Sequence, residues 1–373
     1  MFVEITNEPR NYAWGSTTAI AELFGTEPTG APQAELWLGA HPGSPARVVG
    51  APGEERTLLD VVEGRLPFLL KVLAAAAPLS LQAHPTPEQA EEGFARENAA
   101  GVPLDAPNRN YKDAFHKPEL IYALSEPFRA LSGFRPVAET RAVLAPVAAD
   151  PRIAPLLDRL VDDSSIEAVF AWLIGRGEGV DDLVDAVVEA SATVDGPSWQ
   201  TVRTLADHYP GDPGIVVSLL LHTVELHSGE VLYLPAGNIH AYLEGLGIEL
   251  MAASDNVLRG GLSPKHVDVP ELRRVLDFRP APAPYLAAQE VEEGVQAFRP
   301  PVPDFELTVV SRAAAERGVE VRLGGPAIVL CADGAVAIEG GPSVSRGQAV
   351  FVTDEEWLGL RGDGTVFVAS TGE

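Results

Sequence analysis

Short apolar segments separated by glycine and proline turns make up most of this chain, and no regular alternation of strand and helix accompanies them. Up to about residue 130 they include AELWLGAHPGSPA, PFLLKVL, LSLQAHP and HKPELIYAL, and from about residue 285 they include FELTVVSR, EVRLGGPAIVLCA and GTVFVAS. Alternating strands and helices would predict a parallel sheet, whereas many short strands joined by turns predict an antiparallel barrel or jelly roll. The sequence therefore predicts a mainly β protein.

One block of the chain, residues 137–225, departs from this pattern. Its segments SSIEAVFAWLIGRG and VDDLVDAVVEASATV repeat apolar residues three and four positions apart, which predicts helices. We expect a helical insertion domain at 137–225, inserted into a β domain formed by 1–136 and 226–284, and a separate β domain at 285–373. The proline-rich segment RPAPAPYLAAQE, about residues 279–290, is the predicted linker.

The charge and composition of the chain exclude several classes of partner. The formal net charge is −26, and no run of Lys or Arg interrupts it, so nucleic acid and anionic membranes would be repelled. The chain shows no signal peptide or membrane span, and we expect a cytoplasmic monomer. The single cysteine, Cys331, lies in the apolar run AIVLCADG, which predicts a buried free thiol and no disulfide framework.

Lysine is used sparingly. Of the 27 Lys and Arg residues only four are lysines: Lys71, Lys112, Lys117 and Lys265. A lysine ammonium is a compact point charge, whereas arginine presents a planar fork, so lysine is expected where a phosphate or a moving proton must be met. All four lysines lie in the motifs described below, although chance among so few residues is the alternative.

The stretch LSLQAHP, residues 79–85, places polar residues in an otherwise apolar segment. Pro78 and Pro85 bracket it, which favours a short strand over a helix. In a strand, Ser80, Gln82 and His84 share one face. This face predicts the wall of a binding site.

Two further stretches carry groups that suit a metal. GEVLYLPAGNIH, residues 229–240, has the Gly, Pro and His spacing of cupin barrels and ends in His240. In HKPEL, Lys117 and Glu119 project from the same face. Two imidazoles and a carboxylate are the usual protein ligands of a catalytic zinc, and the oxygen of Gln82 can supply a fourth ligand without adding charge.

A third polar stretch, GIELMAASDNVLRGGLSPKH at 247–266, follows the second histidine motif. Glu249 lies between two apolar residues of a predicted strand. If the intervening turn forms a hairpin, His240 lies close to it on the preceding strand. Each of the other polar residues could instead be solvated or cap a turn; they are Ser254, Asp255, Asn256, Arg259, Ser263 and Lys265.

These motifs resemble those of the type I mannose-6-phosphate isomerases. YKDAFHKPE at 111–119 matches one family signature, except that Phe115 replaces an Asn. HAYLEGLGIELMAASDNVLRGGLSPK at 240–265 matches a second signature, with Gly260 and Ser263 in place of Ala and Thr. The resemblance covers most of residues 1–270 and implies cupin-type antiparallel β jelly-roll barrels with an α-helical domain. It also implies a C-terminal cupin-like domain without metal ligands.

The resemblance implies a metal site and a reaction. One zinc ion per chain would be bound by Gln82, His84, Glu119 and His240, whereas Glu88 begins a helix and is not expected to be a ligand. The reaction would interconvert mannose 6-phosphate and fructose 6-phosphate by proton transfer through a cis-enediol.

Catalytic roles also follow from the resemblance. Arg259 would stabilise the developing negative charge, and the base would be Glu249 or Lys117, between which the sequence does not decide. A lysine base would need a lowered pKa, which nearby zinc could supply. The phosphosugar would contact four further residues: Ser80, Lys71, Asp255 and Lys265.

Two other functions fit part of the pattern. A pair of histidines and a carboxylate in a cupin barrel also describes non-haem iron oxygenases, but an oxygenase needs open positions for dioxygen and no lysines around the metal. A non-catalytic sugar-binding cupin would have no need to retain Glu249, Arg259 and Lys117 together.

Overall fold

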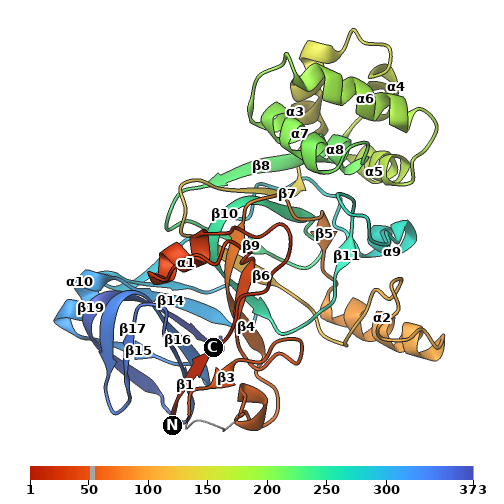
Figure 1. Cartoon of the computed structure of the whole chain (residues 1–373). Helices are drawn as coiled ribbons and strands as arrows, with labels where there is room; N and C mark the ends of the chain where they lie inside the picture. Colours follow the sequence, from red (N-terminus) through yellow and green to blue (C-terminus); the bar gives the residue numbers. More distant parts are fainter. Residues whose placement is uncertain (51–54, 373) are drawn as a thin grey trace.

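The computed structural model describes residues 1–50 and 55–372, and its strands form two antiparallel sheets (Figure 1). This confirms the predicted mainly β class. The first sheet contains β2 (Glu35–Leu38), β4 (Phe68–Ala75), β5 (Gln82–Ala83), β6 (Glu119–Ala123), β7 (Phe128–Phe134), β8 (Leu221–Leu226), β9 (Val231–Leu234), β10 (His240–Ala252) and β11 (Leu258–Arg259).

The second sheet joins the C-terminal strands to the start of the chain. Phe2 pairs with Val352 and Ile5 with Ala349, so the N-terminal segment takes part in both halves of the molecule. The strands of this sheet are β1 (Phe2–Thr6), β3 (Arg47–Val48), β12 (Gln289–Glu292), β13 (Val295–Phe298), β14 (Glu306–Val310), β15 (Val319–Arg322), β16 (Ala327–Ile338), β17 (Ser343–Ser345), β18 (Ala349–Val352) and β19 (Trp357–Ser370).

Strand β10 is the centre of the first sheet and pairs with β4, β5, β6 and β7. The expected hairpin between His240 and Glu249 is wrong, because both residues lie on this one 13-residue strand. The register with β7 shifts between Tyr242 and Glu244, and Gly245 has φ +138°, so the strand changes its course there without ending. The two halves of β10 therefore pair with different strands.

Between β7 and β8 the chain forms a cluster of helices, drawn in green and yellow at one end of Figure 1. Apolar residues three and four apart, such as Val169, Phe170 and Leu173, are buried in its core. Strand β8 begins at Leu221, so the last residues of the segment expected to be helical are extended. The helices of this block are α3 (Val137–Leu144), η2 (Ala145–Val147), α4 (Ala154–Arg159), η3 (Asp163–Ser165), α5 (Ile166–Ile174), α6 (Val180–Ser191), α7 (Pro197–His208), α8 (Gly214–Val217) and η4 (Ser218–Leu220).

Helix α2 (Pro87–Ala99) begins at the predicted Thr86 cap, whose side chain accepts from the backbone N–H of Gln89. Gly93 leaves room for Tyr111, since a Cβ at this glycine would lie 2.3 Å from the tyrosine ring. The Tyr111 hydroxyl donates to Glu271 at 2.6 Å. This packing anchors the segment that leads to Glu119. The remaining helices are α1 (Ala19–Phe24), η1 (Leu58–Asp60), α9 (Val269–Val275) and α10 (Arg312–Arg317).

The proline-rich segment expected to be a linker lies along strand β9. The N–H of Tyr233 donates to the carbonyl of Pro284, and the N–H of Leu286 donates to the carbonyl of Val231, both at 2.9 Å. Cys331 is a free, buried thiol as predicted, and burial raises its pKa to about 11. No helix in the described part of the chain is long and apolar enough to cross a membrane.

Candidate metal centre and substrate cavity

Three residues that are far apart in the sequence converge in the first sheet. His84 follows β5, Glu119 begins β6 and His240 begins β10. One potential ligand atom from each lies within 4.8 Å of the others, and all three residues are at most 1% exposed. Nε2 of His84 is 3.3 Å from Oε1 of Glu119, and Nε2 of His240 is 3.4 Å from Oε2. We call these residues the triad.

Hydrogen bonds fix which imidazole nitrogens face the carboxylate. Nδ1 of His84 donates to the carbonyl of Asn256 at 2.7 Å. Nδ1 of His240 donates to the carbonyl of Asn238 at 3.1 Å. Because a carbonyl only accepts, Nδ1 carries a proton in both rings, and in the neutral ring Nε2 therefore carries a lone pair.

The triad therefore directs lone pairs at a carboxylate, an arrangement that is repulsive unless a cation lies between them. Among the described residues, His84 Nε2 and Glu119 Oε2 have no hydrogen-bond partner although both are buried. Burial lowers the pKa of His84 to about 4, so the ring is neutral at pH 7. Two imidazoles and one carboxylate fit zinc.

Two further predicted residues border the triad. The amide of Gln82 lies with its nitrogen 3.3 Å from Nε2 of His240, and a half-turn of that amide would present its oxygen instead. Lys117 Nζ is 3.0 Å from Oε1 of Glu119. Burial alone would raise the pKa of Glu119, but the Lys117 ammonium holds it well below its usual range. The carboxylate is therefore ionised and available as a ligand.

Asn256 ties the triad to the loop before Glu119. Its fully buried side chain donates to the carbonyls of Asp113 and Phe115 at 2.9 and 2.8 Å and accepts from the N–H of Lys112 at 2.7 Å. The backbone carbonyl of Asn256 accepts the hydrogen bond from Nδ1 of His84. One residue thus couples the orientation of a triad histidine to the loop that leads to the triad carboxylate.

A cavity of about 420 Å³ opens beside the triad and contains all four lysines of the chain. Strands, the loop before Glu119 and the loop after β11 supply its walls. The predicted site residues that line it are Lys71, Ser80, Gln82, Lys117, Asp255, Arg259 and Lys265.

Arg259 and Lys265 are neighbouring cations without an anionic partner. Neither side chain forms an ion pair or hydrogen bond within residues 1–50 and 55–372, and the positive charge of Arg259 lowers the pKa of Lys265. Two cations that repel each other in a cavity are stabilised when an anion binds between or beside them. This part of the cavity suits a phosphate or a developing oxyanion.

Lys71, in contrast, already has carboxylate partners. Its Nζ is 2.8 Å from Oε2 of Glu249 and 3.9 Å from Oε1 of Glu35. Burial alone would lower the pKa of Lys71, but these carboxylates raise it above its usual range. Burial raises the pKa of Glu249. Lys71 lines the cavity, whereas its partner Glu249 does not. Lys71 and Glu249 pair directly in the register of β4 and β10.

The substitution at Phe115 leaves the triad intact. Phe115 is 43% exposed, and the guanidinium of Arg65 stacks 3.6 Å from the centre of its ring. The next residue, His116, is held by Asp304 from the C-terminal part of the chain, with Nε2 2.8 Å from Oδ2. The loop before Glu119 is therefore held by two distant parts of the chain, through Arg65 and Asp304.

Comparison with known proteins places these residues in a family. The family model "Phosphomannose isomerase type I, catalytic domain" matches residues 2–137. Mannose-6-phosphate isomerase from Escherichia coli (strain K12) is 41% identical over 95% of both chains, and the enzyme from Homo sapiens is 32% identical over 94% of this chain and 93% of its own. A variant of phosphomannose isomerase from Salmonella typhimurium superposes with a TM-score of 0.91 at 37% identity, covering all of both chains.

The chain belongs to the mannose-6-phosphate isomerase family.

Membership of the mannose-6-phosphate isomerase family confirms the resemblance drawn from the two signatures, and the match extends through the C-terminal strands. A zinc-bound mannose 6-phosphate isomerase is among the similar structures, with a TM-score of 0.90. The relatives favour neither the oxygenase nor the non-catalytic sugar-binding protein.

Several supporting residues were not assigned a role from the sequence. Asp113 and Asn256 lie within the two signatures, but their partners are more than 140 positions away. Glu35 and His41 belong to the segment AELWLGAHPGSPA, in which polar residues among apolar ones were the only signal. Asp304 carries no local signal, because its partner His116 is 188 positions away.

Asn256→Ala is expected to weaken zinc binding by about 10- to 100-fold, the usual effect of disturbing the groups that orient metal ligands, because the lost side chain fixes both the loop before Glu119 and the backbone carbonyl that binds His84. The measurement is zinc affinity by competition with a chromogenic chelator. Asn7→Ala is the matched control, because the Asn7 amide also joins two backbone segments, at Trp37 and Ser44, without a link to the triad. Equal zinc affinity in a folded Asn256→Ala protein would contradict the role of this residue.

Proposed function

We propose that this chain interconverts mannose 6-phosphate and fructose 6-phosphate by moving a proton between carbons 1 and 2 of the sugar through a cis-enediol. One observation carries the proposal: a buried triad suited to zinc adjoins a cavity that also holds two unpartnered cations. The relatives named mannose-6-phosphate isomerase support the identity of the substrate.

The metal site comprises the triad with Gln82 as the fourth ligand, one zinc ion per chain. Zinc bound there supplies a Lewis acid that polarises the sugar carbonyl and orients its oxygens. The triad residues hold their ligand atoms in place through the Nδ1 hydrogen bonds to Asn256 and Asn238. Lys117 balances the charge of Glu119 from the cavity side.

The phosphate is bound by Lys265 with Ser80, which both line the cavity. Lys71 is less suited to binding the phosphate, because Glu249 and Glu35 already neutralise its positive charge. Arg259 stabilises the negative charge that develops on the enediolate oxygens. Asp255 lines the same cavity and accepts a hydrogen bond from a sugar hydroxyl.

Proton transfer is assigned to Glu249, acting through Lys71: Nζ of Lys71 gives a proton to the Glu249 carboxylate, and the neutral amine then takes the proton from the sugar carbon. Burial raises the pKa of Glu249, which makes its carboxylate a better proton acceptor. Lys71 lies between Glu249 and the cavity and is hydrogen-bonded to it at 2.8 Å. Lys117, the other candidate, is already paired with the triad carboxylate.

The finer architecture is part of the same proposal. The antiparallel strands support cupin-type jelly-roll barrels, and the helices between β7 and β8 support an insertion domain at 137–225. The division into 1–136 with 226–284 and a C-terminal cupin-like domain at 285–373 stays a prediction. A cytoplasmic monomer also stays a prediction, as does the absence of nucleic-acid binding, which the charge of −26 supports.

Arg259→Ala is expected to lower kcat by about 10²- to 10³-fold, the usual cost of removing a group that stabilises a developing oxyanion. The measurement is a coupled assay of fructose 6-phosphate formed from mannose 6-phosphate, with zinc content determined in parallel and expected to be unchanged. Arg273→Ala, which removes a surface ion pair with Glu167, is the control and should match wild type. Wild-type turnover in Arg259→Ala would remove the assigned role.

Glu249→Gln is expected to lower the rate of deuterium incorporation at carbon 2 of mannose 6-phosphate by about 10²- to 10⁴-fold, because the base is lost. NMR in deuterium oxide measures this step directly, and zinc content should be retained. Glu244→Gln, on the same strand and paired with Arg129 at the surface, is the matched control. Undiminished exchange in Glu249→Gln, together with lost exchange in zinc-loaded Lys117→Met, would assign the base to Lys117 instead.

A further inference from the structure

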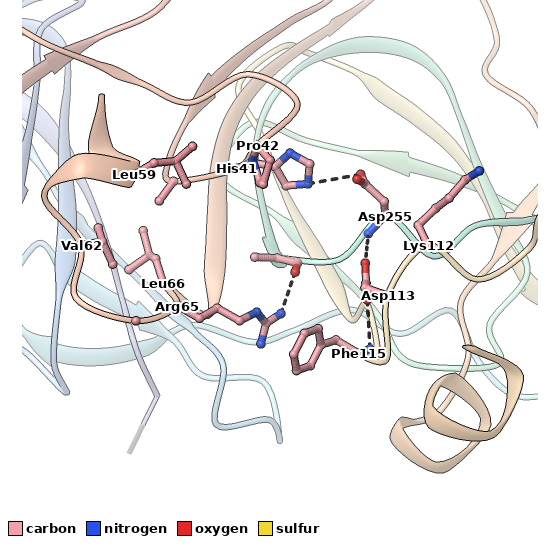
Figure 2. A pocket seen from close by; sticks show the side chains of 13 residues that line it. His41, Pro42, Leu59, Val62, Arg65, Leu66, Lys112, Asp113, Phe115 and Asp255 are labelled. Carbon is pink, nitrogen blue, oxygen red and sulfur yellow. Dashed lines mark hydrogen bonds and ion pairs between the residues drawn. The ribbon is translucent and has the colours of Figure 1, made fainter. Parts of the chain in front are cut away.

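Asp255 lies in a wall between two cavities. A second cavity of about 370 Å³ adjoins the substrate cavity, and the side chains of Lys112 and Asp255 line both (Figure 2). The Asp255 side chain is 54% exposed, so its carboxylate is open to a ligand. The second cavity is otherwise lined by different groups, among them His41 and Phe115.

His41 reaches Asp255 from the side of the second cavity (Figure 2). Its ring is buried, and Nδ1 accepts the N–H of Gly43 at 3.1 Å. The proton of the neutral ring is therefore on Nε2, which lies 3.3 Å from Oδ1 of Asp255. The edge of the ring system of Trp37 packs against His41 at 4.9 Å between ring centres. These contacts leave the imidazole one orientation.

The backbone of Asp255 is held independently. Its N–H donates to Oδ2 of Asp113 at 2.9 Å, and the hydroxyl of Ser254 donates to Oδ1 of the same residue at 2.8 Å. The backbone of Asp255 is fixed by Asp113, and its Oδ1 is taken by His41. Oδ2 of Asp255 has no hydrogen-bond partner among the described residues and remains for the substrate. Burial alone would raise the pKa of Asp255, but His41 and the cavity lysines lower it, so the group is ionised at pH 7.

We propose that His41 is a positioning residue of the isomerase, which fixes the Asp255 carboxylate from outside the substrate cavity so that its free oxygen accepts a hydroxyl of the sugar. The inference rests on the proposed function, because it requires Asp255 to contact the substrate. His41 itself does not line the substrate cavity; its neighbours Asp255 and Trp37 do, and its polar contact, through Nε2, is with Asp255. A ground-state contact of this kind changes KM more than kcat.

The experiment is a double-mutant cycle of His41→Leu and Asp255→Ala, with kcat and KM for mannose 6-phosphate measured for each variant. His41→Leu is expected to lower kcat/KM about tenfold, mainly through KM, as for a lost hydrogen bond to a charged group. His41→Gln keeps an N–H donor and is expected to recover part of this loss. In the Asp255→Ala protein, His41→Leu should have no further effect, because its target is gone.

The outcomes separate this inference from the proposed function. Control measurements are thermal unfolding of each variant and activity of His227→Leu, which removes a surface histidine–carboxylate pair with Glu126. Wild-type KM in folded His41→Leu, or an equal loss with and without the Asp255 carboxylate, would overturn the positioning role. Wild-type kinetics in Asp255→Ala would instead overturn the substrate contact, and an inactive wild-type protein would overturn the proposed function itself.

Discussion

The repulsion inside the triad is the interaction on which the rest of the site depends. Two imidazole lone pairs point at the oxygens of Glu119 in a place that water does not reach, and only a cation makes this arrangement stable. The surrounding structure holds the three groups there: β10 pairs with β5 and β6, and the carbonyls of Asn256 and Asn238 fix the two rings. A loosely held triad would relieve the repulsion by moving apart.

The cations gathered in the substrate cavity are explained by the need to bind an anionic substrate to an acidic protein. With a net charge of −26, the molecule repels a phosphosugar at long range. The four lysines and Arg259 reverse that field in one cavity, and the structure gives them different surroundings. Lys71 and Lys117 are paired with carboxylates, whereas Lys265 and Arg259 have no partner in the described chain. Position in the cavity thus decides which cations remain for the substrate.

Local patterns predicted much of the site because its key groups lie on short strands, where alternation alone shows which residues share a face. The convergence of His84, Glu119 and His240 was predicted on this basis together with family signatures. The expected hairpin between His240 and Glu249 was wrong. Gly245, with a positive φ, lets β10 change its course and continue instead of ending in a turn. Contacts between distant segments, such as His116 with Asp304 or β1 with β18, leave no periodic signal and required the structure.

The measurement that tests the account most directly is the conversion of mannose 6-phosphate to fructose 6-phosphate by chelator-treated protein, before and after zinc is added, with the bound metal counted. We expect activity to be lost with the metal and to return when about one zinc per chain is bound. Full activity in the metal-free protein, or no conversion by a folded and zinc-loaded sample, would contradict it.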